Sequence, residues 1–64
     1  MNKLNIYISE YVDGTLELSP AHMHYCFRDD LNYDDVKPED LIHVMKLIYK
    51  VLKKENIKPV FLFK

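Results

Sequence analysis

His22, His24 and Cys26 are the residues of this 64-residue chain whose types and spacing come closest to a metal site. Imidazole nitrogen and thiolate sulfur bind zinc, which needs its ligands to converge in a tetrahedron. On a strand the three side chains would point the same way, whereas on a helix His24 would point about 160° away from His22. The paired ligands of a specific zinc motif are missing. We therefore predict no cofactor and interpret Cys26 as a core residue, with a small zinc-binding domain as an alternative.

His22 and Cys26 could also form a thiolate–imidazolium pair for nucleophilic catalysis. Such a site needs an orienting group, an oxyanion hole and a pocket, which a core of this size barely provides. The single glycine, Gly14, excludes glycine-rich phosphate-binding loops, because these loops need several positions without a Cβ atom. We therefore predict that the protein is not an enzyme.

Acidic residues gather between residues 29 and 40, where six of them stand against one lysine. The paired aspartates Asp29, Asp30, Asp34 and Asp35 could act as acid and base or hold a divalent cation, but their spacing does not match an EF-hand. Acidic residues favour turns and helix starts, so we predict a solvated loop between two helices. The same four aspartates are candidates for contact with a basic groove on a partner protein.

Lysines dominate residues 46–64, where six of them stand against one acidic residue, although the net charge of the chain is −1. One arc of a predicted helix carries Lys46, Lys50, Lys53 and Lys54 together with His43. Such a stripe can track a phosphate backbone, but it lacks arginine, the usual reader of guanine and phosphate. Nucleic-acid binding is therefore the alternative function, and we expect no membrane partner.

Five tyrosines and three phenylalanines exceed what a core of this size needs. Tyrosine is enriched at interfaces because it buries a rigid ring while its hydroxyl stays satisfied. We expect an uncovered sheet face to carry Tyr7 and Tyr11 together with either Phe61 and Phe63 or their neighbours, and soluble monomers seldom display large apolar patches. These four residues are predicted to bind a protein partner, with a homodimer as one form of the pairing.

Both ends of the chain predict the strands that must position these residues. Leu4, Ile6 and Ile8 alternate with more polar neighbours, which is typical of a half-buried strand and predicts one over residues 3–11. Pro59 precedes a final strand over residues 60–63, which is apolar on both faces. We therefore expect this strand to lie inside the sheet or to be covered on both sides.

The first strand is expected to turn back on itself at Gly14. A two-residue loop would place Glu10 opposite Glu17 and move the next apolar residues to the wrong face. A three-residue loop with Gly14 in the left-handed region instead brings Leu16 and Leu18 onto the apolar face of the first strand. We therefore predict the three-residue loop with a bulge.

Two helices are predicted between the hairpin and the last strand. Ser19 and Pro20 are typical of a helix start, and apolar residues follow at four-residue spacing up to Leu31, although residues 22–27 also alternate passably as a third strand. The second helix starts at Pro38 and ends near residue 55. Its apolar arc of about 220° is wider than one sheet covers, so part of it must pack on another helix or another chain.

These elements predict an α+β fold: one small domain spanning residues 1–64, in the order ββααβ, with a three-stranded sheet and both helices on one face. One cysteine and the lack of a long apolar run predict a cytoplasmic protein. Its composition suggests an AT-rich genome, as in some bacteria and their phages. The expected function is a small interaction module, a regulator or inhibitor of the kind phages and mobile elements encode, which occludes a partner's surface.

Overall fold

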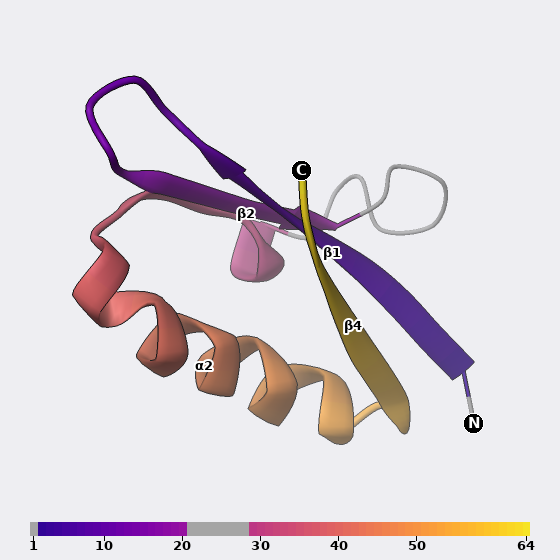
Figure 1. The fold of residues 1–64 in the computed structure, drawn as a ribbon. Coiled ribbons are helices and arrows are strands. Elements are labelled where there is room, and N and C mark those ends of the chain that lie inside the picture. The colour runs from indigo at the N-terminus through magenta and orange to yellow at the C-terminus, as the bar shows by residue number, and fades with distance from the viewer. Residues whose placement is uncertain (1, 21–28) are drawn as a thin grey trace.

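A four-stranded mixed sheet with one helix lying along one face makes up the part of the chain that this computed structural model describes, residues 2–20 and 29–64 (Figure 1). In chain order the elements are the strands β1 (Asn2–Glu10) and β2 (Leu16–Pro20), the 3-10 turn η1 (Asp29–Leu31), the strand β3 (Tyr33–Val36), the 3-10 turn η2 (Pro38–Asp40), the helix α2 (Leu41–Lys53) and the strand β4 (Ile57–Phe63). The strands lie in the order β3-β2-β1-β4, with β1 antiparallel to β2 and parallel to β4. The predicted α+β class is confirmed, but the expected three-stranded ββααβ arrangement is not.

The turn between β1 and β2 is the predicted three-residue loop. The Gly14 N–H donates to the Tyr11 carbonyl over 3.0 Å, and the Tyr11 N–H donates to the Thr15 carbonyl over 2.8 Å. Gly14 has φ +89°, a conformation that costs a side chain energy even though a Cβ there would meet no other atom within 4 Å. The Asp13 carboxylate accepts hydrogen bonds from the Thr15 hydroxyl at 2.7 Å and N–H at 2.9 Å, and these bonds lower the pKa of Asp13.

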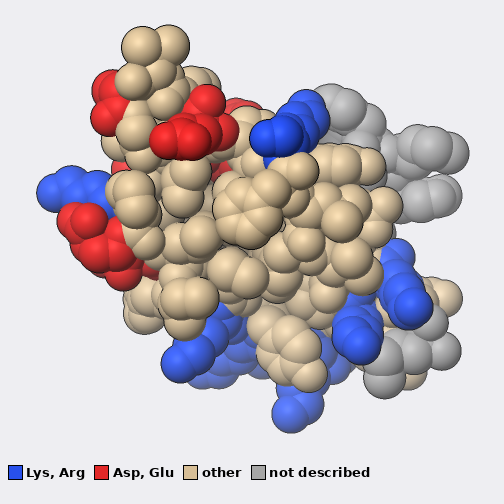
Figure 2. Space-filling model, viewed as in Figure 1, with Lys and Arg blue, Asp and Glu red and all other residues tan. Residues whose placement is uncertain are grey.

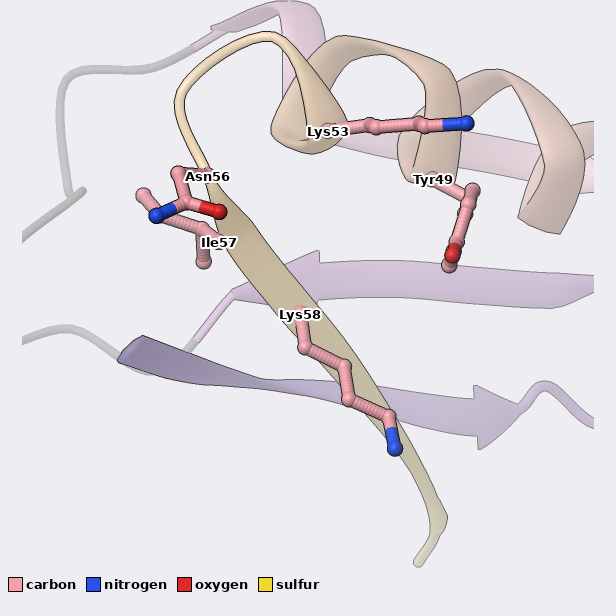
Figure 3. A pocket seen from close by; sticks show the side chains of 5 residues that line it. All are labelled: Tyr49, Lys53, Asn56, Ile57 and Lys58. Carbon is pink, nitrogen blue, oxygen red and sulfur yellow. The ribbon is translucent and has the colours of Figure 1, made fainter. Parts of the chain in front are cut away.

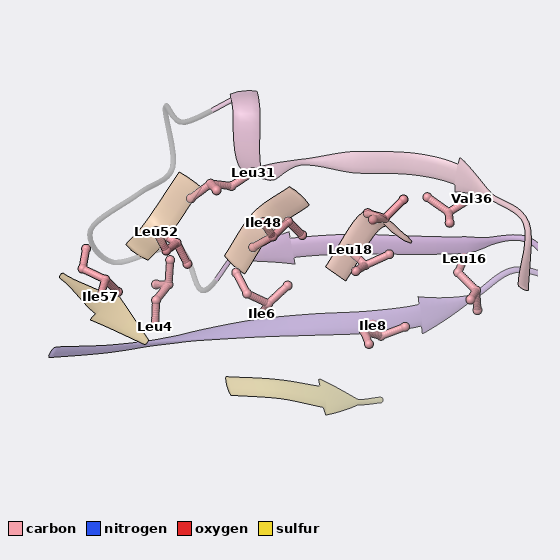
Figure 4. Packing of buried hydrophobic residues seen from close by; sticks show 11 residues of the cluster. Leu4, Ile6, Ile8, Leu16, Leu18, Leu31, Val36, Ile48, Leu52 and Ile57 are labelled. Carbon is pink, nitrogen blue, oxygen red and sulfur yellow. The ribbon is translucent and has the colours of Figure 1, made fainter. Parts of the chain in front are cut away.

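This loop sets the register that buries the apolar face of the hairpin. Ile8 lies opposite Leu18, and Glu17 lies opposite Ser9 rather than opposite Glu10. The even-numbered residues of both strands therefore point toward α2. Figure 4 shows these side chains meeting residues of the helix and of the other strands. The buried cluster consists of Leu4, Ile6, Ile8, Leu16, Leu18, Leu31, Val36, Val44, Ile48, Leu52 and Ile57.

The helix α2 follows η2, which begins at Pro38 as the sequence predicts. Val44, Ile48 and Leu52 recur at four-residue spacing and are buried against the sheet. Asn56 has φ +58° and its N–H donates to the Lys53 carbonyl over 3.1 Å, a left-handed ending that asparagine tolerates well. No helix within residues 2–20 and 29–64 is long and apolar enough to cross a membrane.

The first predicted helix is where the structure departs most from expectation. Ser19 and Pro20, expected to start it, are instead the last two residues of β2, with Pro20 buried. The rest of that segment, including the alternative strand over residues 22–27, lies outside the described residues. Within the described ranges no second helix packs on α2, so its outer residues Ile42 and Tyr49 stay exposed.

The acidic segment was expected to be a loop, but it contains the strand β3. Aspartate is depleted in strands, and this strand pairs with β2 through an irregular register in which Asp35 has φ +54°. Leu18 lies opposite Tyr33 and Leu16 opposite Val36, so two aspartates lie opposite Glu17 alone. Tertiary pairing therefore overrides the local preference of these residues for a turn.

The last strand, β4, is longer than predicted and lies at the edge of the sheet rather than inside it. The Lys64 N–H donates to the Ile8 carbonyl over 2.9 Å. Because the backbone groups of successive strand residues point to alternate sides, the odd-numbered residues of β4 point theirs away from β1. Pro59 is one of these residues and has no N–H, which is typical of an edge strand.

Candidate interaction surfaces

The sheet face opposite α2 carries Tyr7, as predicted from the alternation of β1. Tyr7 is half-buried and pairs with Leu62 of β4, and the Lys64 ammonium lies 5.6 Å from the centre of its ring. This contact is a cation–π interaction at a partly exposed site. The sheet face around Tyr7 therefore carries an aromatic ring that is flanked by aliphatic side chains and a positive charge.

Phe61 and Phe63 do not share that face. Their partners in β1 are Ile6 and Ile8, whose side chains point toward α2, and residues paired across a sheet point to the same side. Phe61 accordingly packs against the buried cluster, whereas Phe63 extends beyond it and is 71% exposed. Of the two expected alternatives, the structure therefore places the neighbours Val60 and Leu62 beside Tyr7, and the assignment of Phe61 and Phe63 to that face is wrong.

Tyr11 joins an acidic group at the hairpin end of the sheet. Its hydroxyl hydrogen-bonds to the Asp34 carboxylate, and this bond is the main reason that the pKa of Tyr11 rises to about 12. Loss of contact with water and the negative charges of Asp34 and Glu17 raise it further. The Asp35 N–H donates to the same Asp34 carboxylate over 2.9 Å. Two segments that are distant in sequence thus meet at Asp34.

The Tyr11 contact predicts a distinct titration. Tyr11 ionises near pH 12 in the folded protein against 10.0 for an ordinary tyrosine, so folding is favoured by this group below pH 10 and the contribution is lost as the pH rises from 10 toward 12. We expect Asp34→Asn to move the last step of a tyrosine absorbance titration to lower pH. Tyr11→Phe, as the control, should remove that step. An unchanged titration in Asp34→Asn would contradict the contact.

Most acidic residues and most lysines lie on different sides of the molecule (Figure 2). Acidic side chains gather over the hairpin turn, β3 and η2, whereas lysines gather over α2 and around the start of β4. Of the predicted aspartates, Asp34 and Asp35 are exposed in β3, and Asp29 and Asp30 begin η1 directly before it. The two charge blocks seen in the sequence are therefore partly separate in space, with Lys64 of the basic block lying beside Tyr7 and Ile8 of β1.

A hollow of about 430 Å³ lies between the end of α2 and the start of β4. Its lining residues are Tyr49, Lys53, Asn56, Ile57 and Lys58. Figure 3 shows the ammonium groups of Lys53 and Lys58 pointing away from each other, so the two cations do not converge on one ligand. Because Tyr49 lines this hollow together with Ile57 and Lys58, its side of α2 lies next to the start of β4.

Exposed apolar side chains continue from this hollow along the same side of the helix. Ile42 lies seven residues, or two turns, before Tyr49 and so shares its side of α2. The Ile42 side chain is 61% exposed and the Tyr49 side chain is 50% exposed. Phe63 lies on the sheet face that α2 covers. Uncovered aliphatic and aromatic groups therefore lie on the flank of the molecule where β4 forms the edge.

The remaining candidates contribute no site to the described structure. The metal candidates His22, His24 and Cys26 fall on residues that the structure does not describe. In residues 2–20 and 29–64 no three histidine, cysteine or acidic side chains are grouped to hold a metal ion. Glu17 was not predicted as a site residue, although the predicted register of the hairpin places it on the same sheet face as Tyr11.

Known proteins offer no guide to which of these surfaces is used. Comparisons with protein-family models, with curated proteins and with solved structures find no match to the chain.

Proposed function

We propose that the protein is a small non-enzymatic interaction module, a regulator or inhibitor of the kind that phages and mobile elements encode, which occludes a surface of a partner protein. The observation that carries this proposal is the acidic end of the molecule, where Asp34 lies beside Tyr11 and accepts a hydrogen bond from the Asp35 N–H. Charge gathered at one end steers association with an oppositely charged partner. The partner surface is accordingly a basic groove.

The hairpin gives this acidic end a defined shape. The side chain of Val12 is fully exposed at the tip of the turn, beside Asp13, whose carboxylate is held by Thr15. An exposed apolar tip with charged residues around it resembles the centre and rim of a protein interface. Tyr11 adds a partly exposed ring whose hydroxyl has an acceptor in Asp34, as suits a tyrosine at an interface.

The proposal is tested by capturing the partner from the native host and measuring its affinity by calorimetry. Asp34→Asn removes one charge and keeps an oxygen that can accept the same hydrogen bonds. We expect this variant to bind about tenfold more weakly, or ~1.4 kcal/mol, with a smaller dependence on salt. Glu55→Gln, which removes the same charge at the opposite end, should bind as the wild type does. Equal affinity of all three proteins would exclude the acidic end as the binding surface.

Nucleic-acid binding is the second candidate, and one observation favours it. Lys3 and Lys58 are direct neighbours across β1 and β4, and both are exposed. Like charges side by side are unfavourable unless an anion lies against them. Titration of the protein with mixed-sequence DNA and RNA at low salt tests this candidate, since phosphate binding weakens steeply as salt is added. Absence of binding would remove it.

A further inference from the structure

The free edge of β4 is the least protected feature of the described sheet. Its outward backbone groups belong to Ile57, Pro59, Phe61 and Phe63, and no described strand pairs with them. The opposite edge, β3, is short, irregular and doubly acidic, and such features discourage further strand pairing. The β4 edge has seven residues and ends in four consecutive apolar ones, residues 60–63, so within the strand only Pro59 and Lys58 oppose pairing.

We infer that this edge pairs with the same edge of a second copy of the chain, antiparallel and about a two-fold axis at Leu62, so that two four-stranded sheets join into one. A two-fold interface uses the same surface on both copies, so the strand must be complementary to itself. The sequence of β4 meets this condition in one register and fails it in the neighbouring one.

With Leu62 on the axis, Phe61 lies opposite Phe63 of the second copy. Both residues point their N–H and carbonyl groups outward, so each such pair forms two hydrogen bonds and the symmetric contact forms four. Leu62 lies opposite its own counterpart, and Val60 lies opposite Lys64 of the second copy. No donor is missing in this register, and no two lysines are opposed.

With Phe61 on the axis the contact is poorer. Phe63 would then lie opposite Pro59 of the second copy, which has no N–H to donate. Lys58 would lie opposite Lys64 of the second copy, and like charges placed directly opposite each other destabilise a strand pair. The positions of the proline and of the two lysines thus select the register centred on Leu62.

The distribution of charge also favours a second copy of the chain as the partner that pairs with the β4 edge. An antiparallel pair places the lysine-rich end of one copy beside the hairpin turn of the other, where Glu10 and Asp13 lie. Opposite charges are therefore adjacent, as they would not be in a parallel pair. The pairing also brings a second sheet alongside Phe63 and the exposed side of α2. The acidic strand β3 lies at the far edge of each sheet and stays free for a partner, so dimer formation and partner binding are separate properties.

The register is tested by sedimentation equilibrium of the wild type and of charge variants at Leu62, which is 38% exposed. We expect a wild-type dimer and at least about tenfold weaker self-association in both Leu62→Lys and Leu62→Glu, because each variant opposes two like charges across the axis. A mixture of the two variants should recover association, since the two-fold places lysine opposite glutamate. Leu47→Lys, with 37% exposure on the other side of α2, is the matched control and should dimerise as the wild type does.

Three results would overturn the inference. The first is a wild type that sediments as a monomer at high concentration. The second is a dimer that Leu62→Lys leaves intact. The third is a mixture of the two variants that associates no better than each variant alone, since this places Leu62 away from its own counterpart. Circular dichroism of each variant establishes that it is folded, so loss of the dimer is read separately from loss of the fold.

Discussion

Replacing Ile48 with alanine is expected to remove about 2–5 kcal/mol from the free energy of unfolding. Ile48 is completely buried at the middle of α2, between the helix and the sheet, so the change removes apolar contacts and leaves a cavity. A chain of 64 residues has roughly 3–10 kcal/mol of stability in total. The variant should therefore lose most of its stability and populate the unfolded state at room temperature.

Ile42→Ala is the matched control for this prediction. It makes the same change in the same helix, but Ile42 is 61% exposed, so we expect a change within about 0.5 kcal/mol. Urea denaturation followed by circular dichroism measures both variants against the wild type. Similar losses of stability in the two would show that α2 does not present the Ile48 side to the sheet.

Leu62→Pro is expected to destabilise the protein by about 1–3 kcal/mol, because it removes an N–H that points toward β1 and leaves a carbonyl of the sheet without its donor. Phe63→Pro, one residue later, removes an N–H that points to the free edge and should leave the sheet pairing intact. The two variants therefore separate the inner and outer edges of β4.

The same denaturation measurement tests this pair of variants, at a protein dilution at which the wild type is monomeric. Amide hydrogen exchange gives a second readout, because loss of pairing in Leu62→Pro should reduce protection along β1. Equal effects of the two prolines would contradict the alternation of backbone groups on which the free edge depends.

The hairpin and the helix were predictable because local patterns determine them. Alternation in β1, the glycine at position 14 and the need to keep Leu16 and Leu18 on the apolar face leave one consistent loop. The helix combines a proline start with a strong four-residue apolar period. In both cases the local preferences of the residues agree with the tertiary structure.

The strand β3 and the placement of β4 were not predictable in this way. Asp34 and Asp35 argue locally for a turn, and only pairing with β2 makes their segment a strand. In β4 both alternating faces are apolar, so composition cannot decide whether Phe61 or Leu62 turns toward the helix. The parallel register with β1 decides it, and that register depends on the whole fold.

The candidate site also has parts that local patterns predict and parts that depend on tertiary pairing. The charge blocks and Tyr11 were visible in the sequence, because composition and strand alternation reveal them. The contact between Tyr11 and Asp34 was not, because it joins residues 23 positions apart through the irregular pairing of β2 with β3. The contact depends on one extra residue in β3, and no local sequence pattern predicts that residue.

The parallel pairing of β1 with β4 also governs the order in which the protein can be completed during synthesis. A ribosome releases β1 first, yet the strand that covers its second edge lies about fifty residues later in the chain. Until then the nascent hairpin exposes an unpaired, apolar strand to other chains, and its pairing must wait for contacts of long sequence separation. We expect folding to be slow for a protein of this size, and nascent chains that end before residue 57 to be the species most prone to aggregate.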